Sequence, residues 1–122
     1  MPLSQLGQIA LPVSNADVSE AFYANSLGLR TLFRFAELVF FDCGGIRLML
    51  DGNAKSPVEV GTGVCHYFKA PQIEIVTAEL KSKGVVFEAE PHLVAKMPDH
   101  ELWMAFFRDP DGHLLALMEE KR

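Results

Sequence analysis

The sequence predicts an α+β fold in which one strand–helix–strands unit occurs twice. A glycine stands where each of two predicted helices ends, at Gly28 and at Gly84. A tight turn joins the last two strands in each half, at residues 43–45 and at residues 109–112. Strand-like runs surround these landmarks in the same order, which is the signature of an internal duplication. This order predicts helices on one side of a mixed or antiparallel sheet. A ferredoxin-like sandwich is the alternative, but the extra strands after each helix count against it.

The first half reads as a strand, a helix and three further strands. Residues 6–13 carry apolar side chains at alternate positions, as in a strand with one buried face. Ser14 or Asn15 offers a side-chain oxygen to cap the helix that follows. In that helix, Val18, Ala21 and Phe22 recur at helical spacing. The remaining strands are predicted at residues 29–35, 38–42 and 46–50.

The second half repeats these elements. A strand is predicted at residues 64–70, and Pro71 or Gln72 opens a helix. One face of this helix carries Ile73, Val76 and Leu80. The later strands are predicted at residues 85–89, 93–96, 102–108 and 113–118.

The length of 122 residues predicts a single domain, at residues 1–122. Module one spans about residues 6–50, and module two spans about residues 62–119. Residues 51–61 are polar, with glycine and proline, and read as the linker between the modules.

The composition is that of an ordinary globular protein, with 49% hydrophobic and 22% charged residues. The net charge of −5 disfavours nucleic acid as a partner, because such binding depends on cationic contacts to phosphate. No apolar run is long enough for a membrane helix. The first residues lack the features of a secretory signal, so we expect a cytoplasmic protein in which Cys43 and Cys65 are free thiols.

Several short motifs together resemble the vicinal oxygen chelate superfamily, which includes glyoxalase I, bleomycin-resistance proteins and extradiol dioxygenases. They are Ile9-Ala10-Leu11-Pro12-Val13, Phe22-Tyr23, Leu27-Gly28-Leu29, and Asp109-Pro110-Asp111-Gly112 followed by Leu114-Leu115-Ala116-Leu117. The resemblance covers nearly the whole chain. It implies two βαβββ modules whose sheets curl into a cup, with a small-molecule pocket between the two copies. It also implies a homodimer.

In the enzymes of this family a divalent metal sits in the cup, held by the first and last strand of each module. Carried onto this chain, the four ligand positions are Gln8, Met49, His66 and Ala116. Glutamine and histidine suit the pattern, but Met49 and Ala116 stand where a carboxylate is expected. Hard divalent ions need oxygen donors, so the resemblance predicts a degenerate metal site and no cofactor. His92 or His100 could supply a ligand for a displaced metal only if their loop folds over the cup. Exposed loop histidines are the simpler interpretation.

Strand alternation then predicts the lining of the cup. Arg47 is expected to face the same way as Met49, Phe68 the same way as His66, and Met118 the same way as Ala116. Arg47 is either a clamp for a carboxylate or a solvent-facing strand residue. The predicted ligand-binding residues are Gln8, Arg47, Met49, His66, Phe68, Trp103 and Met118, and the candidate catalytic residue is His66.

These residues are compatible with three functions. The first is a glyoxalase/bleomycin-resistance-like protein that binds a small molecule without the metal. The second is a lyase, isomerase or dioxygenase that uses a displaced metal or His66 as general base. The third is a subunit or regulatory module of a larger assembly.

Overall fold

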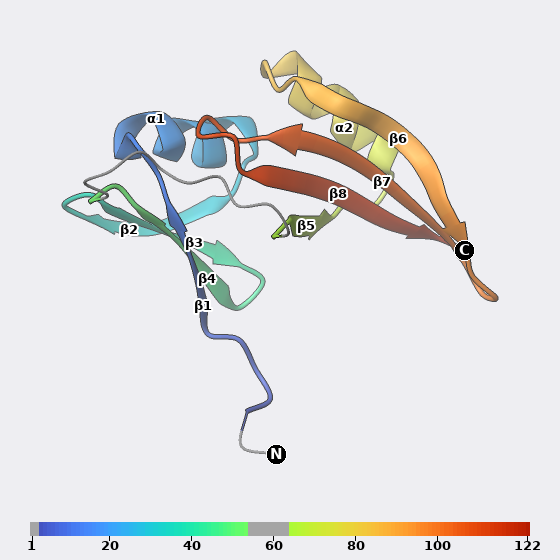
Figure 1. Cartoon of the computed structure of the whole chain (residues 1–122), viewed down its shortest axis with the longest axis horizontal. Coiled ribbons are helices and arrows are strands. Elements are labelled where there is room, and N and C mark those ends of the chain that lie inside the picture. Colours follow the sequence, from blue (N-terminus) through green and yellow to red (C-terminus); the bar gives the residue numbers. More distant parts are fainter. Residues whose placement is uncertain (1–2, 54–63) are drawn as a thin grey trace. The chain divides into compact units, whose positions relative to one another are not determined.

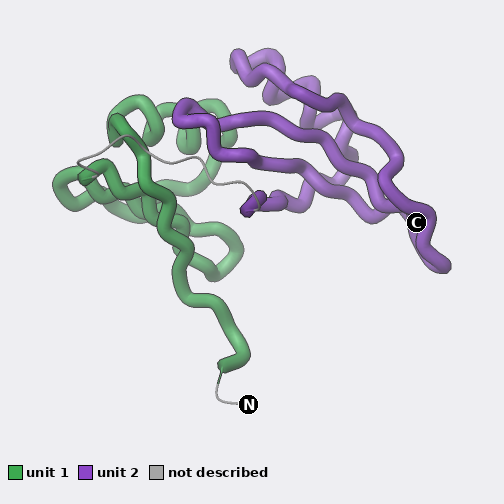
Figure 2. Tube along the Cα trace, in the orientation of Figure 1, with its two compact units in different colours: residues 1–59 green, residues 60–122 purple. Residues whose placement is uncertain are grey.

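A computed structural model of the chain describes residues 3–53 and 64–122, which fall into two compact units (Figures 1 and 2). Residues 54–61 of the predicted linker lie outside the described residues, and the predicted domain and module boundaries stay predictions. No described helix is both long and apolar enough to cross a bilayer.

The first unit contains four strands and one helix that ends in a π-helical turn, Phe22–Ser26. Its elements are β1 (Gln8–Pro12), α1 (Ala16–Ala21), β2 (Arg30–Phe35), β3 (Leu38–Cys43) and β4 (Ile46–Asp51). The side chain of Asn15 caps α1 by accepting a hydrogen bond from the Val18 amide at 3.1 Å, as the sequence predicts. Gly28 ends the helical segment with a φ of 76°.

The second unit repeats the order. Its elements are β5 (His66–Lys69), α2 (Ile73–Ser82), β6 (Phe87–Lys96), β7 (Glu101–Arg108) and β8 (Leu114–Lys121). The strands predicted separately at residues 85–89 and 93–96 form one strand, β6, and register shifts accommodate its extra residues. Gln72 precedes α2 in a left-handed conformation and does not cap it; Glu119 Oε1 accepts from the Ile73 amide at 2.9 Å instead.

The two sheets have the same topology. The strand order is β1-β4-β3-β2 in the first and β5-β8-β7-β6 in the second. In each sheet the first strand runs parallel to the last strand of its unit, and the other neighbours are antiparallel. This confirms the predicted fold class, two βαβββ modules with mixed sheets.

Tight turns fix the register of the hairpins. Gly44 and Gly45 connect β3 to β4 with φ values of 65° and 91°, as in a type I′ turn. The Asp109–Gly112 turn joins β7 to β8, and the buried Asp109 carboxylate accepts from the amides of Asp111 and His113 at 3.0 and 2.8 Å.

Each helix packs on one face of the sheet in its own unit, and that face holds the core. On that face the buried strand residues are Leu11, Val39, Phe41, Leu48 and Leu50 in the first unit and Ala105, Phe107, Leu115 and Leu117 in the second. Phe40 and Ala116 are buried as well, on the opposite face of their sheets. The buried residues of α1 itself are Ala16 and Ser19, followed by Tyr23 in the π-helical turn. Val18 and Ala21 are exposed and Phe22 is half-buried, so helical spacing alone did not find the buried face of α1.

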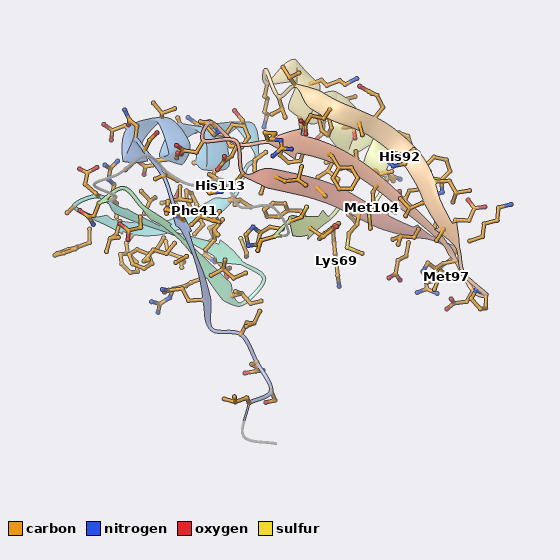
Figure 3. All side chains as sticks on the ribbon, viewed as in Figure 1. Phe41, Lys69, His92, Met97, Met104 and His113 are labelled. Atoms are coloured by element: carbon orange, nitrogen blue, oxygen red, sulfur yellow. The ribbon has the colours of Figure 1, made fainter. Side chains whose placement is uncertain are left out.

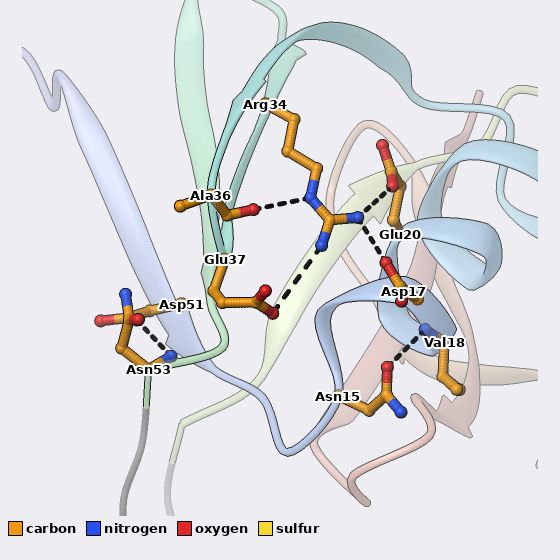
Figure 4. A network of polar contacts seen from close by, with 9 residues as sticks. All are labelled: Asn15, Asp17, Val18, Glu20, Arg34, Ala36, Glu37, Asp51 and Asn53. Carbon is orange, nitrogen blue, oxygen red and sulfur yellow. Dashed lines mark hydrogen bonds and ion pairs between the residues drawn. The ribbon is translucent and has the colours of Figure 1, made fainter.

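A polar network also ties α1 to the β2–β3 hairpin (Figure 4). Arg34 Nη1 contacts Asp17 Oδ1 at 2.7 Å and Glu20 Oε1 at 2.8 Å, while its Nε donates to the Ala36 carbonyl at 2.8 Å. Arg34 therefore lies on the helix-covered face of the first sheet.

Candidate functional site

We call the face of each sheet opposite its helix the open face. In the first unit it is defined by the register between β1, β4 and β3. Gln8 pairs with Arg47 and Ala10 pairs with Met49 across the parallel strands, while Ile9 and Leu11 point to the helix side. Gln8, Arg47 and Met49 therefore share the open face, which agrees with the alternation predicted from the sequence.

The open face of the first sheet carries aromatic rings beside polar side chains. Phe33 and Phe40 are stacked, with ring centroids 4.4 Å apart. The guanidinium carbon of Arg47 lies 6.0 Å from the centroid of the Phe33 ring. Gln8 Nε2 approaches Met49 Sδ at 3.8 Å, which is a weak contact because sulfur is a poor acceptor. The sequence left open which of the β2 and β3 phenylalanines face the helix. Phe41 does, whereas Phe33 and Phe40 lie on the open face, where Phe40 is buried and Phe33 is exposed.

The open face of the second sheet is richer in aromatic and sulfur-containing side chains. The Phe106 ring lies 6.4 Å from Tyr67 and 6.1 Å from His92, measured between ring centroids. Met104 pairs in register with both His92 and Met118 (Figure 3 labels Met104 and His92 on the adjacent strands β7 and β6). Flexible methionines beside aromatic rings form an adaptable apolar surface.

Three residues predicted for the site lie on the other face of this sheet. His66 pairs with Leu115 and Phe68 pairs with Leu117, and both leucines belong to the core beneath α2. Trp103 pairs with Glu119, whose carboxylate binds the first amide of α2. The expectation that His66 and Phe68 share a face with Ala116 and Met118 is therefore wrong. A shift of one residue along a strand moves a side chain to the opposite face, and the sequence pattern was aligned one residue off.

The internal duplication identifies the position in the second unit that matches Gln8. The Val13 amide donates to the Asp51 carbonyl at 2.9 Å, and the Ala70 amide donates to the Met118 carbonyl at 2.8 Å. Gln8 lies as far before Val13 as Cys65 lies before Ala70. By the same comparison, Ala116 matches Met49. The four positions carried over from the family are therefore Gln8, Met49, Cys65 and Ala116.

Cys65 is the residue that sequence reasoning missed. It directly precedes β5, two residues before Tyr67, which pairs with Ala116 on the open face of the second sheet. Burial raises the pKa of the Cys65 thiol, while Tyr67 and the charge of Arg108 act in the opposite direction. The sequence signal for Cys65 is its spacing from Ala70, the buried residue before α2, which equals the spacing of Gln8 from Val13 before α1. The presence of a histidine at the next position is not such a signal.

These four side chains do not suit the divalent metal of the family enzymes. They offer an amide, a thioether, a thiol and a methyl group, without any carboxylate. Mg²⁺, Mn²⁺ and similar hard ions prefer oxygen ligands, and a catalytic metal needs about three protein ligands. Within residues 3–53 and 64–122 no group of three or more His, Cys, Asp and Glu side chains is placed to hold a metal ion.

The two loop histidines considered for a displaced site also have other surroundings. His92 lies within β6, where its Nδ1 is 2.8 Å from the Glu90 carbonyl. His100 lies beside Asp99, with Nδ1 2.7 Å from Oδ1. Hydrogen bonds from Arg122 and then His100 lower the pKa of Asp99 to about 2. Asp99 at the β6–β7 turn is therefore held by an ion pair with Arg122 and a contact with His100.

His66 lies in a partly buried position on the helix-covered face of the second sheet. Burial lowers its pKa from the ordinary value of 6.5, the charge of His113 lowers it further, and Asp109 partly opposes both. Protonation then favours the unfolded chain, so the stability due to neutral His66 is complete above pH 6.5 and is lost as the pH falls through the folded-state pKa.

We expect His66→Gln to lose less stability than the wild type between pH 7.5 and pH 5.5, as measured by urea unfolding. An equal loss in both proteins would contradict this environment for His66.

One hollow on the second unit lies away from the open-face rings. It has a volume of about 290 Å³ and is lined by Lys69, Ala70, Pro71, Met118, Glu119 and Glu120. It opens at the ends of β5 and β8, beside the start of α2.

The family model described as the Glyoxalase/Bleomycin resistance protein/Dioxygenase superfamily matches residues 5–117. A comparison with curated proteins finds no match. Among solved structures, a lactoylglutathione lyase from Agrobacterium tumefaciens is 25% identical, with a TM-score of 0.73 and 97% of this chain and 95% of that chain covered.

Two further solved structures share the fold at lower identity. A glyoxalase/bleomycin resistance protein/dioxygenase from Alicyclobacillus acidocaldarius is 19% identical, with a TM-score of 0.76 and coverage of 95% of this chain and 91% of that chain. A member of the glyoxalase/bleomycin resistance protein/dioxygenase superfamily from Sphaerobacter thermophilus DSM 20745 is 21% identical, with a TM-score of 0.74 and coverage of 98% and 100%.

Proposed function

Because the chain belongs to the Glyoxalase/Bleomycin resistance protein/Dioxygenase superfamily, we propose that it binds a small molecule on the open faces of its sheets, without the metal of the family's enzymes. The observation that carries this proposal is the donor set Gln8, Met49, Cys65 and Ala116, which lacks a carboxylate. A ligand held there is bound by aromatic, sulfur and amide groups instead.

The composition of the open faces supports a binding role. Small-molecule sites combine an apolar surface with a few polar groups that orient the ligand. The first sheet offers the Phe33–Phe40 stack with Gln8 and Arg47, and the second offers Phe106. Met49 and Met118 lie on these same faces.

The enzymatic alternative has less support from the residues. That alternative needs His66 as a general base on the same face as Ala116, but His66 pairs with Leu115 and lies on the opposite, helix-covered face of the sheet. We therefore do not propose a lyase, isomerase or dioxygenase activity. The homodimer and the cytoplasmic location predicted from the sequence stay predictions.

A ligand screen followed by nuclear magnetic resonance tests the proposal. Isotope-labelled protein is titrated with a diverse set of small aromatic and aliphatic compounds, and chemical-shift changes are mapped onto the chain. We expect saturable changes at open-face residues such as Phe106 and Met118, which Phe106→Ala weakens. The matched control is Val86→Ala, since Val86 is 81% exposed and precedes β6. A screen without saturable changes on either open face would contradict the proposal.

A further inference from the structure

We propose that the open face of the first sheet selects planar apolar compounds that carry a carboxylate, with Arg47 binding the carboxylate and Phe33 with Phe40 supporting the planar body. This inference rests on the proposed function and names its ligand class. It depends on a row of side chains that crosses all four strands of the first sheet.

The row consists of Gln8, Arg47, Asp42 and Arg30, each paired in register with the next. Directly paired residues on neighbouring strands face the same side of a sheet, so all four belong to the open face. The row holds two arginines and one aspartate, and its net charge of +1 contrasts with the −5 of the whole chain. An anion approaching this protein is therefore attracted here and repelled by the acidic surface elsewhere.

The aspartate of the row is already engaged by other groups. Asp42 Oδ2 lies 4.0 Å from Arg30 Nη1, and its Oδ1 accepts a hydrogen bond from the Gly45 amide at 3.0 Å. Arg47, by contrast, is in no ion pair with any residue in the described part of the chain, and its interaction there is with the Phe33 ring. Its planar guanidinium keeps its donors for a ligand, and this geometry matches the two oxygens of a carboxylate.

The neighbours of Arg47 indicate the rest of the ligand. Gln8 pairs with Arg47 across from it in β1. The one described partner of the Gln8 side-chain amide is the Met49 sulfur at 3.8 Å, and a ligand oxygen, as a better acceptor, can replace this sulfur. On the other side, Phe33 is 48% exposed and stacked on Phe40 at 4.4 Å. A planar ring can extend this stack while its carboxylate meets Arg47, because Arg47 already lies over the Phe33 ring.

The test compares 2-naphthoate with 2-naphthamide, which have the same rings and differ in the negative charge. Binding is followed in isotope-labelled protein by the side-chain signals of Gln8 and Arg47. We expect 2-naphthoate to bind about ten-fold more tightly than the amide. Arg47→Gln should abolish this preference by weakening 2-naphthoate far more than 2-naphthamide, and Phe33→Leu should weaken both compounds.

Two variants of the same row serve as matched controls. Asp42→Asn keeps an acceptor for the Gly45 amide and removes a negative charge next to Arg47, so it should tighten 2-naphthoate binding by about two- to five-fold. Arg30→Gln removes the same charge as Arg47→Gln from a side chain that is 78% exposed, and it should change the affinity by less than about two-fold.

Equal affinity for the two compounds, or an unchanged preference in Arg47→Gln, would overturn this inference while leaving the proposed function intact. The inference also fails if neither compound shifts the Gln8 and Arg47 signals. In that case other compounds from the screen that bind the open faces would show that the proposed function still holds.

Discussion

Replacing Phe41 with alanine is expected to lower the free energy of unfolding by about 3–5 kcal/mol. The Phe41 ring is fully buried and lies 6.1 Å from the buried Tyr23 ring, between centroids. Removing it leaves a cavity between β3 and the helical segment that rigid neighbours cannot fill. Urea unfolding followed by circular dichroism measures the change.

Phe35 provides the matched control from the same hairpin. It is 71% exposed, so Phe35→Ala should change the free energy of unfolding by less than about 0.5 kcal/mol. A milder variant, Phe41→Leu, should fall between the two. Similar losses for Phe41→Ala and Phe35→Ala would contradict the assignment of the helix-covered and open faces in the first sheet.

Replacing Asp109 with alanine is expected to lower the free energy of unfolding by about 2–4 kcal/mol. Asp109 is 5% exposed, and its Oδ1 accepts from the Asp111 and His113 amides at 3.0 and 2.8 Å. The alanine variant leaves two backbone donors in the β7–β8 turn without this acceptor, and buried donors without a partner are costly.

Asp109→Asn separates the hydrogen bonds from the charge. Its amide oxygen can still accept from both backbone amides, so we expect the variant to keep more than half of the stability that alanine loses. Thermal and urea unfolding of the three proteins give the comparison. Equal losses for Asn and Ala would show that these two hydrogen bonds do not stabilise the turn.

The duplication and the fold class could be predicted because they depend on local signals. Glycines with positive φ mark the helix ends and the β3–β4 turn, and the Asp-Pro-Asp-Gly sequence marks the β7–β8 turn. These signals are independent of what packs against each element. The open-face residues of the first sheet followed from alternation for the same reason, since β1 and β4 have no bulge.

The residues of the second sheet were harder to predict because alternation does not give the register between strands. Because a histidine directly follows Cys65, the ligand position of the family was assigned to His66. The pairing of β5 with β8 instead puts His66 opposite the buried Leu115. The single-residue error then carried Phe68 to the wrong face as well. The buried face of α1 was missed because small and polar residues, Ala16 and Ser19, form it.

The central claim is that this member of the superfamily works without the metal of the family's enzymes. The most direct test is the metal content of protein purified without chelators, followed by titration with Ni²⁺, Zn²⁺, Mn²⁺ and Fe²⁺. Gln8, Met49, Cys65 and Ala116 supply no carboxylate and no imidazole, and the Cys65 thiol is their one strong ligand, fewer than the about three protein ligands that a catalytic metal needs. We therefore expect well under one metal ion per chain and no saturation at micromolar concentrations. About one ion per chain, lost in Gln8→Ala or Cys65→Ala, would contradict the account and indicate a metalloenzyme.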